Sequence, residues 1–157
     1  MEHVEIERKW KPDALPEAAL SCPYTEIEQG YLCRSPVVRV RKDGEAYYLT
    51  YKGEGLLKRE EYNLPLTKAA YETLIGKSEG RLIQKRRYRM PVVFGSSLEK
   101  RRYTAEIDVF SGELTGLFLV EVEFPSEEEA CAFTAPSWFG REVTEDPAYS
   151  NSFLSSL

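Results

Sequence analysis

Glu5-Ile6-Glu7-Arg8-Lys9, near the N-terminus, is the stretch that decides how this chain folds. Successive side chains of a β-strand point to opposite faces, so Glu5, Glu7 and Lys9 would share one face, spaced ~7 Å apart along the strand. Two carboxylates and an ammonium group in one row are unusual for a strand face. The row suits a site that binds a divalent metal ion together with phosphate.

Later segments repeat this alternation of charged and apolar residues, which is expected of strands that are exposed to water on one face and packed against the core on the other. They are residues 38–41, 47–52, 59–64, 85–89, 105–109 and 120–124. For any one segment, the plainer interpretation is an antiparallel strand with a solvated outer face. The acids, however, gather in the first and the last two segments, and the bases gather in the middle ones. Such segregation is what a site for both a metal ion and a polyanion needs.

The aligned faces supply candidate site residues of both signs. The basic ones are Lys9, Arg39, Arg41, Lys52, Arg59, Lys85 and Arg87. The acidic ones are Glu5, Glu7, Glu61, Glu106, Asp108, Glu121 and Glu123. Buried like charges repel strongly unless something compensates them. A triphosphate would neutralise the repulsion among the bases, since Arg binds phosphate oxygens bidentately. Mg²⁺ would neutralise the repulsion among the carboxylates and would also bridge phosphates.

Glu5-Ile6-Glu7-Arg8-Lys9 resembles the ExExK signature of the CYTH superfamily, the triphosphate tunnel metalloenzymes. Segments 39–41, 51–53, 59–62, 85–88 and 120–124 resemble successive strand motifs of that superfamily, in the same order. Segments 138–140, 143–146 and 149–151 resemble the C-terminal end of its short bacterial members. The resemblance covers almost the whole chain and is closest to the small bacterial inorganic triphosphatases.

The resemblance implies a mainly β fold, in which a closed eight-stranded antiparallel barrel forms a tunnel and a few short helices lie outside. Periodicity alone gives only an antiparallel sheet, because a sandwich would produce the same alternation. Strands are expected at residues 2–10, 25–32, 37–42, 45–52, 57–66, 82–93, 98–110 and 117–124. Helices are expected at 13–20, 67–75, 127–133 and near 147–157. Asp43-Gly44 predicts a type I′ hairpin turn, and residues 1–157 are expected to form a single domain.

The resemblance also implies roles for the residues. Glu5, Glu7, Glu121 and Glu123 would bind Mg²⁺ or Mn²⁺, assisted by Glu106 and Asp108. Glu61 would hold metal-bound water or orient arginines, and the basic residues would bind the substrate. Water activation has two candidate sources: the metal ion, or Lys52, crowded by cations, acting with Tyr31. Lys9 is a third candidate catalytic residue, and Tyr31 as a packed strand aromatic is the alternative.

One position departs from the family pattern. Many members carry Glu-x-Glu where this chain has Glu61-Tyr62-Asn63, and Asn63 cannot supply the second charge. Arg89 is either a further base or an exposed strand end. Trp10 and Trp138 could stack a base or a thiamine ring, although packing is the plainer role for them.

Composition narrows the classes of function. The chain has 21 basic and 26 acidic residues, a net charge of −5, which argues against a general nucleic-acid binder. Its three cysteines show no metal or disulfide spacing, as expected in a reducing cytosol. A single histidine excludes a histidine-rich site, so oxygen ligands are expected to hold any metal. A cytoplasmic protein without a membrane partner is expected, and the oligomeric state stays open, a homodimer included.

Three functions compete on this basis. The first is metal-dependent hydrolysis of the terminal phosphate of inorganic tripolyphosphate, favoured by a compact chain with little insertion to bind an organic group. The second is another chemistry of the same fold: class IV adenylate cyclase, thiamine triphosphatase or nucleoside triphosphatase. The third is a non-catalytic polyphosphate or nucleotide binder, which would need fewer acids. The last segment, from residue 149 onward, is expected to cross one tunnel mouth and so favour a bare inorganic chain.

Overall fold

The computed structural model describes residues 4–95, 98 and 100–157 and is built mainly from antiparallel strands. The strands are β1 (Val4–Lys11), β2 (Tyr24–Arg34), β3 (Val37–Asp43), β4 (Ala46–Lys52), β5 (Lys58–Pro65), β6 (Glu79–Gly95), β7 (Lys100–Phe110), β8 (Phe118–Glu123) and β9 (Arg141–Glu142). The helices are α1 (Glu17–Leu20), α2 (Lys68–Ile75), α3 (Glu127–Ala132) and α4 (Asn151–Leu154). Single 3₁₀ turns, η1 to η3, lie at Gly112–Leu114, Ser137–Phe139 and Pro147–Tyr149.

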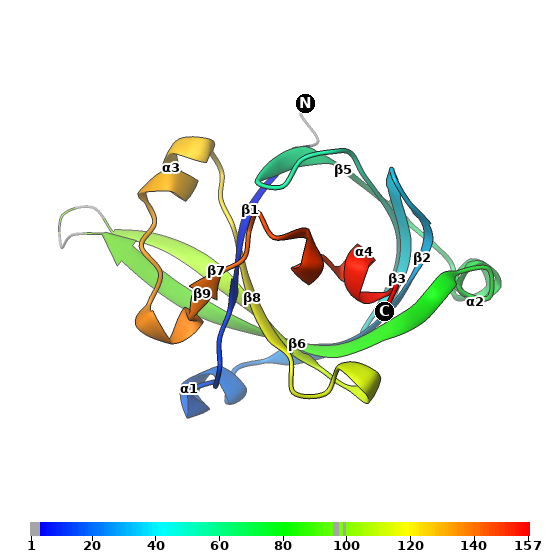
Figure 1. Ribbon diagram of the computed structural model, residues 1–157, viewed down its shortest axis with the longest axis horizontal. Coiled ribbons are helices and arrows are strands. Elements are labelled where there is room, and N and C mark those ends of the chain that lie inside the picture. The colour runs from blue at the N-terminus through cyan, green and yellow to red at the C-terminus, as the bar shows by residue number, and fades with distance from the viewer. Residues whose placement is uncertain (1–3, 96–97, 99) are drawn as a thin grey trace.

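Eight of these strands close into a barrel. Hydrogen-bonded neighbours follow the order β5-β4-β3-β2-β6-β7-β8-β1, and β1 pairs in turn with β5 at Val4↔Glu60 to Ile6↔Lys58. Every pairing is antiparallel, and β9 lies outside the barrel, paired with the end of β1. Figure 1 looks down the barrel, with β5 and β6 on opposite sides of its opening. The predicted closed eight-stranded antiparallel barrel is confirmed.

The main apolar core lies outside this barrel. Trp10 packs edge-on against Phe139 at 5.0 Å between ring centroids and against Phe133 at 5.7 Å, and Trp138 packs on Phe139. These rings cover the outer face of β1, β7 and β8 on the side where Figure 1 places α3. The packing role expected for both tryptophans is therefore observed. Since apolar burial drives folding and is achieved on this outer face, the lumen is left for charged side chains.

Both predicted helix caps are present. Thr67 Oγ1 accepts a hydrogen bond from Ala70 N at 3.1 Å, and the helix α2 runs to Ile75 before Gly76. Ser126 Oγ likewise accepts from Glu129 N at 3.1 Å at the start of α3. Both caps satisfy a backbone N–H that a helix leaves unpaired in its first turn.

Several boundaries differ from the sequence-based expectation. The first helix, expected at 13–20, covers only Glu17–Leu20, because Pro16 is its N-cap. The strand β6 extends beyond 82–93 to Glu79–Gly95 and pairs with β7 as far as Gly95↔Lys100.

The hairpin turn after Asp43 is present, but the described residues with positive φ are all glycines, Gly44 (φ 60°) among them. A type I′ turn needs positive φ at both central residues, so that turn type is wrong. The turn expected at residues 95–97 and the first residues of the 2–10 strand lie partly outside the described residues.

The C-terminal segment packs across one end of the barrel. There Ile83, Phe110 and Leu119 form an apolar layer on the lumen side of β6, β7 and β8, and Leu154 of α4 packs against it with 4% exposure. We call this the closed end. Figure 1 shows α4 within the outline of the ring. The expected crossing of a mouth by this segment is observed, although Phe153 and Leu157 remain 44% and 60% exposed.

Among the described residues, the helices are too short and too polar for any of them to cross a membrane.

Candidate active site

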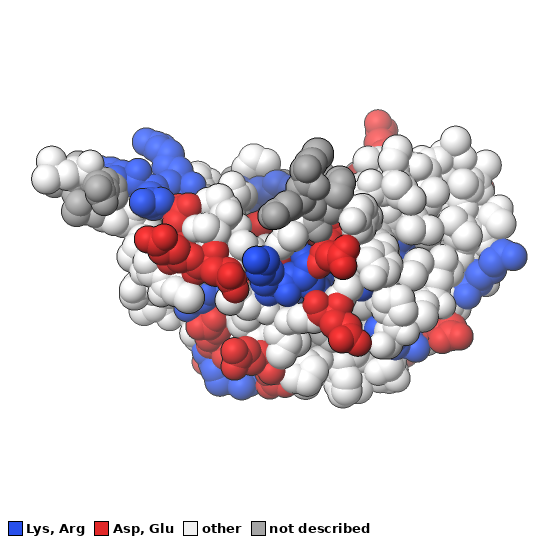
Figure 2. Space-filling model, turned by 90° about the horizontal axis from the view of Figure 1, so that it is seen from above, with Lys and Arg blue, Asp and Glu red and all other residues white. Residues whose placement is uncertain are grey.

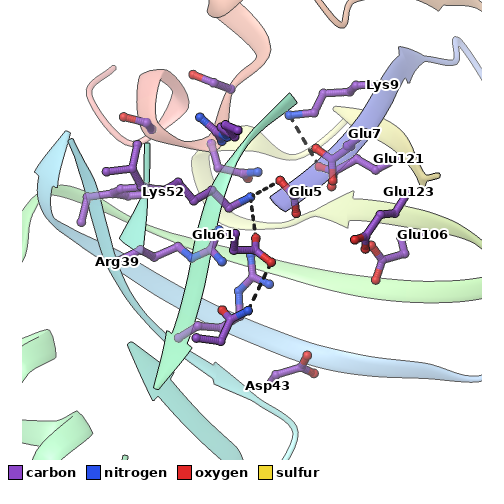
Figure 3. Close-up of a pocket in the computed structure, with 18 of the residues that line it drawn as sticks. Glu5, Glu7, Lys9, Arg39, Asp43, Lys52, Glu61, Glu106, Glu121 and Glu123 are labelled. Carbon is purple, nitrogen blue, oxygen red and sulfur yellow. Dashed lines mark hydrogen bonds and ion pairs between the residues drawn. The ribbon is translucent and has the colours of Figure 1, made fainter. Parts of the chain in front are cut away.

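The lumen holds a cavity of about 620 Å³. All the site residues predicted from the sequence line it except Lys85 and Asp108, and Asn63, Arg89 and Asn151 line it as well. Figure 3 shows its side chains converging from different strands, with acids of β1, β7 and β8 on one wall and Lys52 and Arg39 on the other. On the outer face in Figure 2, by contrast, acidic and basic side chains lie intermingled. The face drawn in Figure 2 thus lacks the grouping of charge that Figure 3 shows in the lumen.

Strand register brings the charged residues together. Residues directly opposite each other in an antiparallel pair share a face of the sheet. Glu7 of β1 lies opposite Glu123 of β8, and Lys9 lies opposite Glu121. In the same way Glu5 lies opposite Arg59 of β5, and Lys52 of β4 lies opposite Glu61. Each alternating segment of the sequence therefore contributes its charged face to one lumen.

Lys52 lies between two carboxylates. Its Nζ is 2.9 Å from Glu5 Oε1 and 3.2 Å from Glu61 Oε2, contacts that Figure 3 also shows. The expectation that cations crowd Lys52 is therefore wrong: its closest charged partners are acids. Burial raises the pKa of Glu5, and the adjacent Glu61 adds to the rise against the effect of Lys52. Burial would also raise the pKa of Glu61, but hydrogen bonds from Glu5 and Lys52 outweigh it and lower that pKa to about 2.

Asn63, the departure from the family pattern, orients Glu61. Thr50 Oγ1 donates to Asn63 Oδ1 at 2.6 Å, and this fixes the amide so that Asn63 Nδ2 donates to Glu61 Oε1 at 3.2 Å. Thr50 is fully buried. Asn63 thus supplies a neutral hydrogen bond where a carboxylate would add a charge. The chain of contacts runs through Thr50, Asn63, Glu61 and Lys52 to Glu5, and it bridges β4, β5 and β1.

Arg87 is held rigidly by acids. Its Nε and Nη2 reach the two carboxylate oxygens of Asp108 at 2.7 and 2.9 Å, a bidentate pair. Further contacts of 3.4 and 3.5 Å join Arg87 to Glu106 and Glu121. Burial alone would lower the pKa of Arg87, but Asp108 and Glu106 raise it well above its usual value. Arg87 keeps its charge and a fixed position on the wall.

Lys85 and Asp108, two predicted site residues, lie behind the cavity wall instead of lining it. Their side chains are fully enclosed and form an ion pair of 2.7 Å. Direct contact of Lys85 with substrate and of Asp108 with metal was expected from their alignment with Arg87 and Glu106. Lys85 and Asp108 lie next to the apolar layer of the closed end, and this layer covers the pair. In this structure Asp108 holds Arg87, and Lys85 neutralises Asp108.

Two guanidinium groups face the cavity without an acidic partner. Arg39 is 5% exposed, and its buried Nε has no hydrogen-bond partner in the described chain. Arg41 Nε donates at 2.7 Å to Gln29 Oε1, a neutral group. Burial, together with the charges of Arg39 and Arg87, lowers the pKa of Arg41 to about 10. Unneutralised buried cations are costly, and an anionic ligand would relieve this cost.

The opposite wall carries carboxylates that have no partner. Within the described residues, the side chains of Glu7 and Glu123 make no hydrogen bond or ion pair, although the two residues lie opposite each other on β1 and β8. Burial and the charges of Glu121 and Glu5 raise the pKa of Glu7 well above its usual value. Burial and the charges of Glu5 and Glu61 also raise that of Glu123. The two acids are thus crowded, as a site for a cation would be.

Lys9 and Glu121, which lie directly opposite each other on β1 and β8, form a further contact, with Lys9 Nζ 3.5 Å from Glu121 Oε1. Burial would raise the pKa of Glu121, but Lys9 and Arg87 hold it well below its usual range. Tyr31 lines the cavity with 2% exposure, and its hydroxyl accepts a 3.5 Å hydrogen bond from Gln29 Nε2. Arg89 lies near the open mouth, 3.4 Å from Asp43, so it is a lining base and not an isolated strand end.

Sequence reasoning missed three residues at or beside the cavity: Gln29, Arg34 and Asn151. Gln29 is fully buried and holds both Arg41 and Tyr31. Because Gln29 and Tyr31 are two residues apart on β2, strand alternation already places them on one face. Arg34 falls outside this alternation because the register of β2 shifts between Tyr31 and Cys33. Asn151 lies in the C-terminal segment, which has no strand periodicity.

A closed barrel whose lumen is lined with acids and bases, and which leaves two buried guanidinium groups without an acidic partner, defines a class of protein that binds a small polyanion inside the barrel. The model of the CYTH domain family matches residues 3–145. The chain therefore belongs to the CYTH family.

Named relatives are similar over nearly the whole chain. The inorganic triphosphatase of Nitrosomonas europaea is 41% identical over 153 residues, which cover 96% of this chain and 95% of that protein. The inorganic triphosphatase of Acetivibrio thermocellus is 38% identical, with 96% and 92% covered. The crystal structure of the inorganic triphosphatase NE1496 matches with a TM-score of 0.67 and 37% identity, covering 96% of this chain and 93% of that one.

Proposed function

We propose that this protein hydrolyses the terminal phosphoanhydride bond of inorganic tripolyphosphate inside its lumen. The observation that carries the proposal is the pair Arg39 and Arg41, two buried guanidinium groups with no acidic partner. They face a cavity of about 620 Å³, which has room for a short chain of phosphates. The family membership and the names of the relatives support the same activity.

The basic residues divide into two groups. Arg39, Arg41 and Arg59 have no carboxylate partner closer than 4 Å in the described chain, so they are available to phosphate oxygens. Arg87, Lys52 and Lys9 are already paired with acids and hold fixed positions. A triphosphate that spans both groups is oriented before reaction, and orientation together with charge neutralisation supplies most of the catalysis in phosphoryl transfer.

The acidic wall fits Mg²⁺ or Mn²⁺. Its donors are all carboxylate oxygens, which suit these ions, and the raised pKa values of Glu7 and Glu123 show acids that a cation would stabilise. Among the described residues, no three such side chains converge on one point as a ready-made site. Mg²⁺ commonly takes only one or two carboxylates and completes its shell with water and phosphate. We place it at Glu7 and Glu123, beside Glu5, Glu106 and Glu121.

When bound, the ion would neutralise phosphate charge and lower the pKa of a nearby water molecule. The basic residues of the lumen would hold the phosphate groups of the substrate. In the reaction a water oxygen forms a bond to the terminal phosphorus, the bridging P–O bond breaks, and pyrophosphate leaves. Lys52, Lys9 and Tyr31 are the candidate residues at the reacting groups. Lys52 is fixed by Glu5 and Glu61, so we assign it to stabilise negative charge on the phosphates.

A substrate panel tests the proposal. Purified protein is given tripolyphosphate, ATP or thiamine triphosphate with Mg²⁺ or Mn²⁺, and phosphate, pyrophosphate and cyclic AMP are quantified. We expect phosphate and pyrophosphate from tripolyphosphate, with a higher kcat/KM than for the other two. Cyclic AMP as the main product, or equal values for ATP, would favour the other chemistries of the fold. Binding without turnover would favour a non-catalytic binder.

Metal dependence is tested separately with Glu123→Gln. We expect this variant to need a higher Mg²⁺ or Mn²⁺ concentration for half-maximal activity. Its fold should be kept, because the Glu123 side chain makes no hydrogen bond or ion pair in the described chain. Glu113→Gln, which alters an exposed acid of η1 outside the lumen, is the matched control. Near wild-type activity of Glu123→Gln at low metal would remove Glu123 from the metal site.

A further inference from the structure

The C-terminal segment is part of the cavity wall. Pro147, Ser150, Asn151 and Ser152 line the same cavity as Arg39 and Arg41. Basic residues from three separate strands hold the segment by its oxygen atoms: Lys9 Nζ donates to Tyr149 O at 3.2 Å, Arg34 Nε to Ser152 O at 3.3 Å, and Lys85 Nζ to Asn151 Oδ1 at 3.2 Å. The segment is therefore positioned by the charged lumen itself.

The orientation of the Asn151 amide follows from its partner. Lys85 Nζ is paired with Asp108 at 2.7 Å and donates to Asn151 Oδ1 at 3.2 Å, so the Asn151 atom that faces Lys85 is the carbonyl oxygen. The amide nitrogen, Nδ2, is on the other branch of the side chain. It has no hydrogen-bond partner among the described residues, although Asn151 is only 9% exposed.

The free amide nitrogen faces the cavity. Lys85 is fully enclosed and lies behind the wall, whereas Asn151 lines the cavity. With Oδ1 turned toward Lys85, Nδ2 is the polar atom left for the lumen. It is not among the buried polar atoms that lack a partner, which indicates that it retains contact with the open space. A donor that is nearly buried, fixed and unused is suited to an acceptor on a ligand.

We propose that Asn151 is a substrate-binding residue whose Nδ2 donates a hydrogen bond to a phosphate oxygen at the closed end of the cavity. The inference rests on the proposed function, in that it takes the ligand to be a triphosphate. At this end Lys9 is already paired with Glu121 and Lys85 with Asp108. A neutral donor adds a contact to phosphate without adding a further charge that needs an acidic partner.

A double-mutant cycle separates this role from a purely structural one. If Asn151 only holds Lys85, then Asn151→Ala has no further effect once Lys85 is replaced by Met. If Asn151 contacts phosphate, Asn151→Ala weakens tripolyphosphate binding in both backgrounds, by about 10- to 100-fold in Kd for a hydrogen bond to a charged group. The measurement is isothermal titration calorimetry with tripolyphosphate in EDTA, so that neither metal nor turnover contributes.

Ser156→Ala, which alters an exposed residue of the same segment outside the cavity, is the matched control and should bind as wild type. Asn151→Asp is the second variant: it keeps an oxygen on Lys85 but lacks the donor, and we expect it to lose at least as much affinity as Asn151→Ala. Wild-type affinity in Asn151→Asp, or no loss from Asn151→Ala in the Lys85→Met background, would overturn the inference. Failure of the wild-type protein to bind tripolyphosphate in EDTA, together with failure to hydrolyse it in the presence of Mg²⁺ or Mn²⁺, would instead overturn the proposed function.

Discussion

At the scale of single residues, neighbours across the strands decide what each lumen charge can do. Glu7 and Glu121 lie on the same wall, yet burial and nearby acids raise the pKa of Glu7, whereas Lys9 and Arg87 overcome burial and lower that of Glu121. Glu121 therefore fixes bases, and Glu7 is left for a cation. Arg39 and Arg87 likewise have different surroundings. Arg87 is fixed by acidic partners, whereas Arg39 has none and is left for an anion.

Arg39→Ala should chiefly raise KM for tripolyphosphate. Arg39 has no partner to lose within the described chain, so the change removes phosphate contacts worth about 1.5–3 kcal/mol, or roughly 10- to 100-fold. The empty protein should be as stable as wild type or more stable, because a buried unpaired cation is removed. Steady-state kinetics and thermal unfolding measure the two effects.

Lys42→Ala, on the exposed outer face of the same strand, is the control for Arg39→Ala and should change neither KM nor kcat. An unchanged KM in Arg39→Ala would place Arg39 outside the substrate site. Arg87→Ala should behave differently, because it leaves Asp108 buried and short of its bidentate partner. A loss of about 3–5 kcal/mol in stability is expected for such a broken pair.

Glu7→Gln should stabilise the metal-free protein at neutral pH but not at acidic pH. A carboxyl group whose pKa is raised on folding binds more protons in the folded state than in the unfolded state. Its contribution to stability is therefore complete below its unfolded pKa and is lost as pH rises through the folded pKa. Denaturant titrations in EDTA at pH 4.5 and pH 8 measure the free energy of unfolding. The variant should be more stable than wild type at pH 8 and no more stable at pH 4.5. Equal stability of the two proteins at both values would contradict the crowding of Glu7.

At the scale of elements, the lumen is shaped by strand register and closed by α4. The strands β6, β7 and β8 carry charges along most of their lumen face and apolar side chains at the closed end, where Leu154 completes the layer. The same segment contributes Asn151 and backbone oxygens to the cavity wall. A change in α4 should therefore affect both stability and the choice of substrate.

Leu154→Ala should lower the free energy of unfolding by about 2–5 kcal/mol, as expected when a buried leucine is truncated in a packed layer. Because α4 covers one mouth, the variant should also reduce the preference for tripolyphosphate over ATP in kcat/KM. Urea unfolding and the two rate measurements test this. Phe153→Ala, at the neighbouring and 44% exposed position, should lose less than about 1 kcal/mol. Equal losses in both variants would show that α4 does not seal the closed end.

At the scale of the whole molecule, apolar packing and charge are kept apart. The main core packs on the outside of the barrel under α3, and the lumen holds acids and bases, some of them paired and some without a partner of opposite charge. Without a ligand, the unpaired acids of the lumen repel one another, and so do the unpaired guanidinium groups. The stability of the protein should consequently depend on that ligand more than is usual for a protein of this size.

Tripolyphosphate should raise the unfolding temperature even without metal. A ligand that binds only the folded state adds about 2.7 kcal/mol at one hundred times its Kd, or roughly 5–10 °C for a chain of this length. Differential scanning fluorimetry in EDTA measures the shift, and sulfate at equal ionic strength is the control. A shift no larger than that of sulfate would count against a lumen built for a polyphosphate chain.

Much of this molecule was predictable from the sequence. Strand alternation is a local property, so segments such as Glu5-Ile6-Glu7-Arg8-Lys9 already showed which side chains share a face. Alternation alone left a sandwich open, and the barrel was predicted from the resemblance of these segments to the CYTH family. Tertiary structure alone decided which charges neutralise each other. Lys52 meets Glu5, and Lys85 meets both Asp108 and Asn151, across long separations in sequence. Such contacts depend on register, barrel closure and the path of the C-terminal segment, because neutralisation requires two groups within a few ångströms in space, a condition that no local periodicity contains.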